Sequence, residues 1–382
     1  MSMHVTIDAR YVAASQSGVG MYTANLVQAL ATLDSENRYT YIIRDGQPEL
    51  IVGRNFRPWT TRISFENHWV GDLWQNVYLP LHLRTRRVDL FHGPAVFLPL
   101  IKLGFRTVVT IHDLVAFRFP QTIPMKYALY MRLMIRLAVR SANRVITASM
   151  QTRNDLVERL RVPSDKIEVI HEALAASFTP VNDPARLAEV RRRYGLLEPY
   201  ILFVGNLEPR KNLVRLIEAY ARLKRRSAFP HRLVLAGKRG WLYRPIFEAV
   251  ERLGLGREVV FTGYVPPEDL PVLYALADLF AFPSLYEGFG LPVLEAMACG
   301  TPVITARTGS LPEVAGDAAW YVEPEDVDAL TEGMARLLGD DEARKRLVAR
   351  GHLQAKRFSW TRTAEATLDI YRRALDHEAR TP

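Results

Sequence analysis

The chain alternates short apolar runs with longer amphipathic segments, and this alternation predicts repeated strand–helix units. In the first half, apolar runs predict strands at residues 4–8, 39–43, 88–91, 107–111, 144–148 and 167–170. Helices are predicted between them at residues 19–31, about 71–84, 126–141 and 151–160. Strands that are apolar throughout and separated by helices are covered on both faces, so we expect a parallel sheet.

A second series of the same kind begins at Tyr200. It predicts strands at residues 200–205, 232–236, 258–261, 277–282, 303–306 and 320–322, with helices at 212–224, 244–252, 269–277 and 291–298 and more after Glu325. The polar, proline-bearing stretch 178–184 separates the two series. We therefore expect an α/β fold with two doubly wound, Rossmann-like domains, residues 1–178 and 179–360, facing each other across a cleft. An amphipathic helix at 361–382 ends the chain.

Length and composition agree with two ordinary soluble domains. The chain has 382 residues, 48% of them hydrophobic, and contains no unbroken apolar run of 18 residues, so no membrane-spanning helix is predicted. Its first eight residues form a strand pattern that includes Asp8, unlike a secretory signal. The single cysteine, Cys299, excludes a disulfide within the chain and fits a reducing cytosol. We expect a cytoplasmic protein.

The formal net charge of +9 indicates an anionic partner: nucleic acid, an anionic membrane surface or a polyanionic substrate. Neither zinc-ligand spacing nor an RNA-binding aromatic signature is present, so nucleic acid is not expected. Arg132, Arg136 and Arg140 share one face of a predicted helix. That face is either a solvated basic surface or a contact for lipid phosphate, and we expect peripheral contact with the cytoplasmic face of an anionic membrane.

The run from residue 283 to 302 combines a strand end, a glycine loop and a helix start. Pro292 suits the first turn of a helix, and Gly300 its end. Gly288 and Gly290 leave the loop backbone open to a ligand. The unpaired N–H groups and positive dipole end of a helix start favour an anion such as phosphate.

Two carboxylates, Glu287 and Glu295, flank this loop eight residues apart. Acids on either side of a bound anion can accept hydrogen bonds from two sets of hydroxyl groups. A nucleotide-sugar has this shape, with a ribose diol, a diphosphate and a hexose. The alternative is that both acids are solvated and that the glycines only shape a turn.

Arg210 and Lys211 form a cation pair at the start of the helix predicted after the strand at 200–205. Two cations at a helix start oppose its dipole, and a bound anion reverses that penalty. The alternative is a pair of ordinary surface cations.

The whole run at 283–302 resembles the E-x7-E motif of retaining glycosyltransferases of family 4, which have the GT-B fold. The matching residues are Pro283, Ser284, Glu287, Gly288, Phe289, Gly290, Leu291, Pro292, Glu295, Ala296 and Gly300. The resemblance implies transfer of a hexose from a nucleoside-diphosphate sugar to an acceptor hydroxyl, with the anomeric configuration retained. It implies no cofactor or metal, and the sequence shows no clustered ligand set.

Residues 205–212 resemble the mannosyltransferase-like branch of this family. The resemblance therefore implies GDP-mannose as the donor, and a glycan or lipid-linked oligosaccharide as the acceptor, in polysaccharide biosynthesis. The intact E-x7-E loop argues against the related nucleotide-sugar epimerases. A catalytically silent nucleotide-sugar-binding subunit of a polysaccharide assembly complex remains an alternative.

The resemblance also implies a role for each matching residue. Glu287 is expected to hold sugar hydroxyls and Glu295 the ribose diol. The donor diphosphate is expected to contact Arg210 and Lys211, together with the loop residues Gly288, Phe289, Gly290 and Leu291. A backbone contact to the base is expected at Val265.

In the first domain the resemblance implies two further contacts. Gly18 and Gly20 lie in a loop expected before the first helix, and this loop is expected to close over the diphosphate. His112, at the end of the strand predicted at 107–111, is expected to bind a hydroxyl of the transferred sugar. The terminal helix at 361–382 is expected to cross back onto this domain.

Overall fold

The computed structural model describes residues 2–12, 18–47, 50, 52–63, 71, 73–196, 198–226 and 229–376. The chain forms two compact units. Unit 1 consists of Met1–Leu114, Leu129–Ala173 and Ser359–Pro382, and unit 2 of Val115–Ala128 and Leu174–Phe358. Each unit is built on one parallel sheet, as the two series of apolar runs predict.

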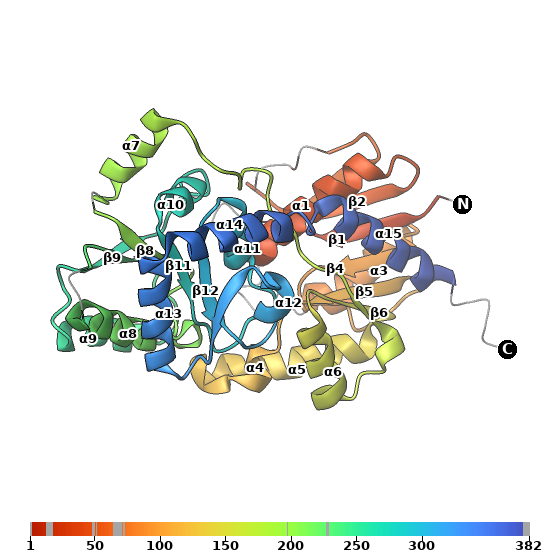
Figure 1. The fold of residues 1–382 in the computed structure, drawn as a ribbon. Helices are drawn as coiled ribbons and strands as arrows, with labels where there is room; N and C mark the ends of the chain where they lie inside the picture. The colour runs from red at the N-terminus through yellow and green to blue at the C-terminus, as the bar shows by residue number, and fades with distance from the viewer. Residues whose placement is uncertain are drawn as a thin grey trace. The chain divides into compact units, whose positions relative to one another are not determined.

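The sheet of unit 1 has seven strands, all paired in parallel (Figure 1). In spatial order they are β3 (Phe56–Thr61), β2 (Arg38–Arg44), β1 (His4–Asp8), β4 (Leu90–Gly93), β5 (Arg106–Ile111), β6 (Arg144–Thr147) and β7 (Ile167–Val169). Val5 of β1 pairs with Tyr39 on one side and Leu90 on the other. The chain order reverses between β1 and β4, so the carboxyl ends of these strands form a switch point.

Six of these strands are predicted by the apolar pattern, and β3 is not. Along β3 only Phe56 is buried, the other side chains are exposed or partly exposed, and the strand includes Pro58. β3 lies at the edge of the sheet, where proline is tolerated because one side of the strand needs no ladder partner. A half-exposed edge strand lacks the apolar run on which the prediction depends.

The helical segments of unit 1 are α1 (Gly18–Leu33), η1 (Trp74–Tyr78), α3 (Leu79–Thr85), α5 (Met125–Ser141, with its first residues in unit 2), α6 (Met150–Leu160), η3 (Ser164–Lys166) and α15 (Trp360–Asp376). The helix predicted at about 71–84 is divided into the π-helical η1 and the following α3. α1 begins at Gly18, so Gly18 and Gly20 lie in its first turn. The prediction that they precede the helix is wrong.

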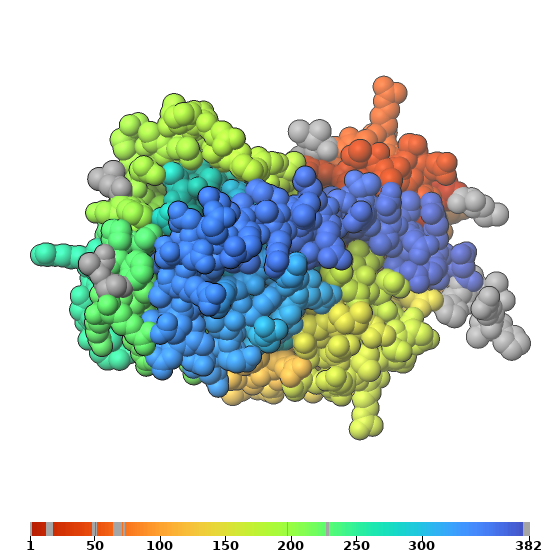
Figure 2. Space-filling model, viewed as in Figure 1, coloured from red at the N-terminus to blue at the C-terminus, as the bar shows by residue number. Residues whose placement is uncertain are grey.

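The C-terminal helix α15 packs against α1 and continues the core of unit 1. Figure 2 shows α15, in dark blue, lying along the red and orange surface of the first elements. Its inward side chains Ala364, Leu368 and Tyr371 share one buried cluster with Leu26 and Leu30 of α1. An element from the end of the chain therefore completes the core formed by its beginning.

The sheet of unit 2 has six strands in parallel. Their spatial order is β10 (Val259–Gly263), β9 (Arg232–Ala236), β8 (Tyr200–Val204), β11 (Leu279–Phe282), β12 (Val303–Ala306) and β13 (Ala319–Val322). All six are predicted from the apolar runs. The chain order reverses between β8 and β11, which makes these two strands the switch point of unit 2.

The helices of unit 2 form two packed groups. One group contains α8 (Leu213–Arg226), α9 (Arg244–Arg252) and α13 (Val327–Gly339). The other contains α7 (Pro184–Arg193), α10 (Leu270–Leu276), α11 (Leu291–Ala298), α12 (Leu311–Ala315) and α14 (Asp341–Ala355). The crossovers run one way from β8 to β10 and the other way from β10 to β13, so their right-handedness places α8 and α9 on one face of the sheet and α10, α11 and α12 on the other.

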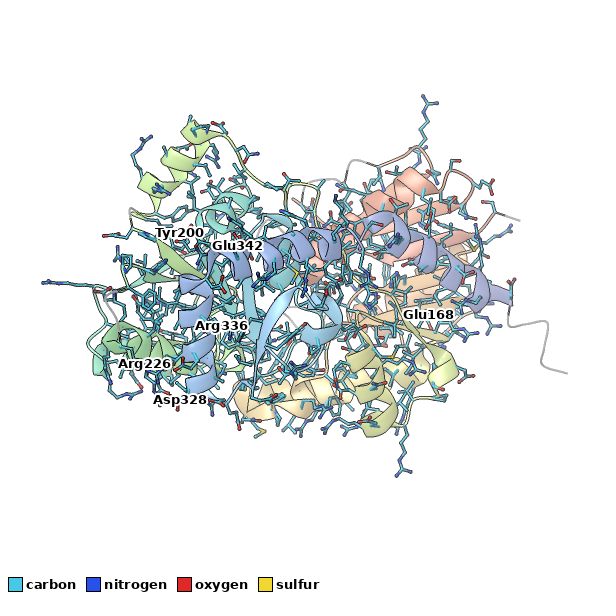
Figure 3. All side chains as sticks on the ribbon, viewed as in Figure 1. Glu168, Tyr200, Arg226, Asp328, Arg336 and Glu342 are labelled. Carbon is cyan, nitrogen blue, oxygen red and sulfur yellow. The ribbon has the colours of Figure 1, made fainter. Side chains whose placement is uncertain are left out.

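Short segments and surface ion pairs complete unit 2. The short segments are α4 (Val115–Arg118), η2 (Pro120–Thr122) and η4 (Pro209–Lys211). α8 and α13 are joined at their surface by Arg226, which pairs with Glu332 and approaches Asp328 (Figure 3). Such exposed pairs contribute little stability, so the helices are held mainly by their apolar faces.

A buried hydrogen bond ties α15 to the sheet of unit 1. The Tyr371 hydroxyl lies 2.7 Å from Nδ1 of His92, and Thr110 Oγ1 lies 2.9 Å from the other ring nitrogen. Burial, and to a smaller extent the nearby charge of His112, lowers the pKa of His92 to about 3, so the ring is neutral. We predict that Tyr371→Phe lowers the free energy of unfolding by about 1–3 kcal/mol, because it leaves a buried ring nitrogen unpaired.

Urea unfolding of both proteins measures this difference. Tyr78→Phe is the matched control, because the Tyr78 side chain is half exposed on η1. Equal stability of the two variants would contradict the structural role given to the Tyr371 hydroxyl.

Candidate functional site

The candidate site lies at the switch point of unit 2. The loop after β8 (residues 205–212) and the loop after β11 (residues 283–290) follow adjacent strands of the sheet. In open α/β sheets, ligands bind outside the carboxyl ends of the strands at such a point. The first loop carries Arg210 and Lys211, and the second carries Glu287.

The structure joins these three residues in one ion cluster. Lys211 Nζ lies 2.7 Å from one carboxylate oxygen of Glu287, and Arg210 Nη1 lies 2.6 Å from the other. The second guanidinium nitrogen of Arg210 lies 2.6 Å from Glu208. The sequence predicts two separate features, a cation pair and an acid, but it gives no signal that they contact each other or that Glu208 takes part.

Hydrogen bonds to backbone carbonyl groups hold the two loops together. The Leu285 N–H donates to the carbonyl of Arg210 at 2.9 Å, and the Asn212 side chain donates to the carbonyl of Pro283 at 3.0 Å. Asn212 ends the turn η4 in a left-handed conformation with φ of 61°, which asparagine tolerates better than most residues. The loop after β8 is therefore shaped to place both cations beside the loop after β11.

The cluster is buried, and burial makes its charges depend on one another. Glu287 and Lys211 are each 7% exposed. Burial alone would raise the pKa of the Glu287 carboxyl, but the charges of Arg210 and Lys211 lower it to about 2. Burial and the neighbouring Arg210 lower the pKa of the Lys211 ammonium, against the opposing effect of Glu287. Glu287 is thus ionised at neutral pH, and its carboxylate keeps lone pairs for further donors.

Glycine is required at two places around this loop. Gly290 has φ of 111°, and a Cβ there would lie 2.9 Å from the side chain of Leu311. Gly309 has φ of 57° and approaches the backbone of Glu287 so closely that a Cβ would lie 2.9 Å from its carbonyl oxygen. Ser310 donates to that same carbonyl at 3.1 Å. Gly309 and Ser310 thus hold the backbone of the predicted anion-binding loop in place at Glu287.

The start of α11 presents few N–H groups. Pro292 has none, and the N–H of Val293 donates to the carbonyl of Gly290 at 3.0 Å. Among the hydrogen bonds of the described residues, none uses the N–H of Leu291. Leu291 is therefore the helix-start donor best placed for an anion, while Gly288 and Phe289 precede it in the loop.

Glu295, the second acid of the motif, lies inside α11 in a different environment. It is 9% exposed and accepts a hydrogen bond of 2.8 Å from the Tyr274 hydroxyl. Burial raises the pKa of its carboxyl to about 7, although the Tyr274 hydrogen bond acts in the opposite direction. The two acids of one motif therefore differ in charge: Glu287 is ionised, and Glu295 titrates near neutral pH.

Val265, the predicted base contact, is buried in the loop after β10. Next to it, the Lys238 ammonium lies 4.4 Å from the centre of the Tyr264 ring. At the neighbouring strands, a Cβ on Gly237 would lie 2.0 Å from the carbonyl oxygen of Gly205, so only glycine allows β8 and β9 to end this close together. The structure places Val265 two strands from β8 but does not test its role.

His112 lies in unit 1, directly after β5. Its Nδ1 lies 2.8 Å from a carboxylate oxygen of Glu172, and its Nε2 lies 2.8 Å from the carbonyl oxygen of Pro94. Both partners are acceptors, so the imidazolium form, in which both ring nitrogens donate, satisfies both contacts. Burial lowers the pKa of His112, but the hydrogen bond and the charge of Glu172 together raise it by more, so the net effect is an increase.

Glu172 was not predicted from the sequence. The only available signal is a carboxylate shortly after the strand predicted at 167–170, and this signal is too common to single it out. His112 also packs edge-on against the Tyr22 ring of α1, at 4.8 Å between centroids. Gly20 lies half a turn before Tyr22 on α1, and a Cβ on Gly18 would meet nothing within 4 Å. Residues 13–17, the preceding part of the predicted glycine loop, lie outside the described residues.

The described residues contain neither a metal-binding cluster nor a membrane-spanning helix. They hold no group of three or more histidine, cysteine, aspartate or glutamate side chains placed to bind a metal ion. No helix in the same part of the chain is long and apolar enough to cross a membrane.

The pKa of Glu295 predicts how stability depends on pH. A carboxyl with a pKa of about 7 when folded and 4.5 when unfolded binds its proton more tightly in the folded state, so stability falls as pH rises from 4.5 to 7. Glu295→Gln removes this titration. We predict that the variant and the native protein are similar near pH 4.5, and that above pH 7 the variant is more stable by about 3 kcal/mol.

Denaturant unfolding across this pH range measures the effect. Glu248→Gln, on the exposed face of α9, is the matched control and should follow the native protein at every pH. A constant difference between Glu295→Gln and the native protein would show that Glu295 does not titrate in this range.

Two family profiles match the chain, one in each half. The profile described as Glycosyltransferase Family 4 matches residues 16–176, and the profile described as Glycosyl transferases group 1 matches residues 190–354. Together they cover both sheets and the candidate site.

Curated relatives carry related descriptions. O-antigen chain mannosyltransferase B of Escherichia coli is 38% identical over 291 residues, which span 76% of each chain. The serotype-specific mannosyltransferase WbdA of Escherichia coli is 32% identical over 304 residues, 77% of this chain but only 37% of WbdA. D-inositol 3-phosphate glycosyltransferase of Salinispora tropica is 35% identical over 258 residues, 63% of this chain and 53% of the relative.

Solved structures share the fold. Sucrose-phosphate synthase from Thermosynechococcus elongatus superposes with a TM-score of 0.79 at 24% identity, over 98% of this chain and 100% of that chain. Anabaena HepE in complex with UDP and glucose superposes with a TM-score of 0.74 at 18% identity, over 97% and 99%. The fold is that of the GT-B glycosyltransferases. With this fold, the two family profiles and a relative 38% identical over three quarters of its length, the chain belongs to glycosyltransferase family 4.

Proposed function

We propose that this glycosyltransferase moves a hexose from a nucleoside-diphosphate sugar to a hydroxyl of a glycan or lipid-linked acceptor, with retention of the anomeric configuration. The observation that carries the proposal is the buried cluster of Glu287, Arg210 and Lys211 at the switch point of unit 2. It supplies two cations for a diphosphate and an ionised acid for sugar hydroxyls, and the N–H of Leu291 follows a few residues later at the start of α11.

The charges of the cluster suit a leaving diphosphate. With Glu208, the cluster has two cations and two carboxylates, so its formal charge is zero before the donor binds. When the bond between the anomeric carbon and the phosphate oxygen breaks, its electron pair stays on the diphosphate. Arg210, Lys211 and the N–H of Leu291 stabilise that charge, and preorganised donors of this kind contribute several kcal/mol to a transition state.

Retention follows if the acceptor attacks from the face that the diphosphate leaves. The acceptor oxygen forms the new bond to the anomeric carbon, and its proton passes to the departing phosphate oxygen. No covalent enzyme intermediate is needed. Glu287, fixed by its two cations, uses its remaining lone pairs to accept sugar hydroxyls, and Glu295 accepts the ribose diol. Gly18, Gly20 and His112 of unit 1, and Val265, remain proposed donor contacts.

The donor proposed here is GDP-mannose. The support is that two of the most similar relatives, O-antigen chain mannosyltransferase B and WbdA, are described as mannosyltransferases. By the same reasoning the acceptor is a growing surface polysaccharide or its lipid-linked precursor. The net charge of +9 supports a peripheral contact of this cytoplasmic enzyme with an anionic membrane. We propose that neither a metal nor a cofactor is needed.

A panel of nucleotide-sugars tests the proposal. The protein is incubated with GDP-mannose, UDP-glucose and related donors in the presence of polysaccharide acceptors, and released nucleoside diphosphate is measured. We expect release from GDP-mannose and, by NMR, an α-linked mannose product that keeps the donor's configuration. Binding of a donor without release, with every acceptor, would indicate a silent binding subunit instead.

Glu287→Gln separates the two roles of the cluster. The substitution keeps the shape of the side chain but removes a negative charge beside Arg210 and Lys211. Turnover should fall by about 100-fold or more, because the amide holds the sugar less well as positive charge develops. Affinity for the nucleoside diphosphate should stay the same or increase, because the cluster gains a net positive charge.

Steady-state kinetics and isothermal titration with the nucleoside diphosphate measure these two quantities. Lys211→Gln is the contrasting variant, since it removes a cation and should weaken nucleotide binding. Glu248→Gln controls for the loss of any carboxylate. Native turnover in a folded Glu287→Gln protein would refute the role of Glu287.

A further inference from the structure

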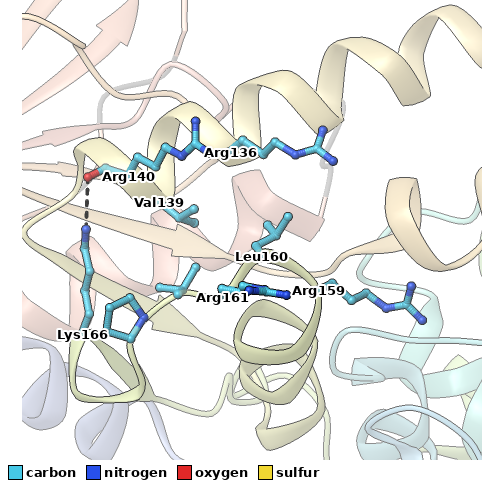
Figure 4. A pocket seen from close by; sticks show the side chains of 9 residues that line it. Arg136, Val139, Arg140, Arg159, Leu160, Arg161 and Lys166 are labelled. Atoms are coloured by element: carbon cyan, nitrogen blue, oxygen red, sulfur yellow. Dashed lines mark hydrogen bonds between the residues drawn. The ribbon is translucent and has the colours of Figure 1, made fainter.

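A basic pocket lies in unit 1, between the C-terminal ends of α5 and α6 (Figure 4). Its volume is about 450 Å³, within the range of ligand-binding pockets. Figure 4 shows α5 on one side, the end of α6 on the other, and the segment with Lys166 closing one end. The lining residues are Arg136, Val139, Arg140, Arg159, Leu160, Arg161, Val162, Pro163 and Lys166. None of them belongs to the candidate site.

The positive charge of this pocket exceeds what the fold requires. Five of its nine lining residues are cations, and none is an acid. Cations are favourable at helix C-terminal ends, but each such end carries only about half a negative charge. The ends of α5 and α6 therefore offset about one of the five charges, and Asp165, which lies close to Lys166, offsets one more. Arg140, Arg159, Arg161 and Lys166 carry four of the five charges, so about two positive charges remain without counting Arg136.

Three of the four arginines that line the pocket have no acidic partner among the described residues. Among the described residues, no ion pair or carboxylate hydrogen bond involves Arg140, Arg159 or Arg161. A second basic pocket, in unit 2, gives the opposite picture. There Arg222 pairs with Asp328, and Arg252 pairs with Glu218. Two arginines of that second pocket thus have their charges paired with acids, unlike Arg140, Arg159 and Arg161.

The local structure holds the cations close together. Lys166 Nζ donates to the backbone carbonyl of Arg140 at 3.2 Å, which fixes the ammonium at the end of α5. Arg161 occupies a left-handed conformation with φ of 54° after the end of α6, a position where glycine is usual. Burial lowers the pKa of the nearby Lys102, and Lys166 lowers it further. A bound anion would offset the positive charge gathered between the ends of these two helices.

We propose that this pocket of unit 1 binds a phosphate-bearing group. Phosphate offers several acceptor oxygens for the guanidinium and ammonium donors that converge there, and arginine binds it in a bidentate manner. The site is formed without any residue of unit 2 and does not depend on the transferase function proposed above. A protein that transfers no sugar would still bind phosphate here.

The surface next to the pocket bears on the source of the phosphate. On α5, Leu129 and Leu133 are 56% and 54% exposed, and they lie about two turns and one turn before Arg136 on the same side of the helix. Exposed apolar side chains beside phosphate-binding cations suit a lipid headgroup. A soluble polyphosphate offers the same oxygens, so the experiment has one arm for each source.

The test uses the double variant Arg140→Gln/Arg159→Gln of the full chain. Binding of inorganic pyrophosphate is measured by isothermal titration, and binding to phosphatidylglycerol vesicles by co-sedimentation, with phosphatidylcholine vesicles as the neutral reference. In at least one arm, the double variant should lose about tenfold or more in affinity. Both arginines are exposed, so thermal unfolding should remain native and show that the fold is intact.

The matched control is Arg191→Gln/Arg192→Gln, which removes two charges from the last turn of another helix, α7. Pyrophosphate also fits the candidate site of unit 2, so the pocket is identified by the binding that the pocket variant loses and the control retains. If pyrophosphate binding is lost by the pocket variant and kept by the control, the ligand is a soluble phosphate. If only binding to anionic vesicles behaves in this way, the ligand is a lipid headgroup. If the pocket variant loses no binding in either arm, or if both variants lose binding equally, the proposal is overturned.

Discussion

One buried carboxylate organises the candidate site. Glu287 is almost fully buried, and a buried charge is tolerated only when it is paired and hydrogen-bonded. Its partners, Arg210 and Lys211, come from a different loop, 77 and 76 residues earlier in the chain. The pairing therefore fixes the loop after β8 against the loop after β11. Removal of either side would leave an uncompensated charge in the interior, so the two loops act as one structure.

The topology of the sheet explains why this cluster forms where it does. The chain leaves β8 toward β9 and β10 and returns to the other side at β11, so the two loops follow neighbouring strands at one edge. The same reversal leaves the start of α11 open. The second acid, Glu295, lies inside that helix without a cation and titrates near neutral pH. One motif thus supplies an acid that is ionised at neutral pH and another that titrates near neutral pH, and their surroundings set the difference.

Most of the architecture could be predicted from the sequence, because buried parallel strands are apolar along their whole length. The edge strand β3 could not, because it is half exposed and contains Pro58. The positions of the motif residues could be predicted as well, but not their contacts. Glu208 and Glu172, which pair with Arg210 and His112, are 2 and 60 residues away from their partners, and only the fold brings the second pair together. Spacing along a chain does not encode such pairs.

The central claim is that the diphosphate of the donor binds between the two loops of unit 2. A crystal structure of the protein with the nucleoside diphosphate of its donor tests this claim most directly. The account predicts phosphate oxygens within hydrogen-bond distance of Lys211 Nζ, the Arg210 guanidinium and the N–H of Leu291, with the ribose hydroxyls at Glu295. A nucleotide bound elsewhere, with Arg210 and Lys211 still paired only to carboxylates, would contradict it.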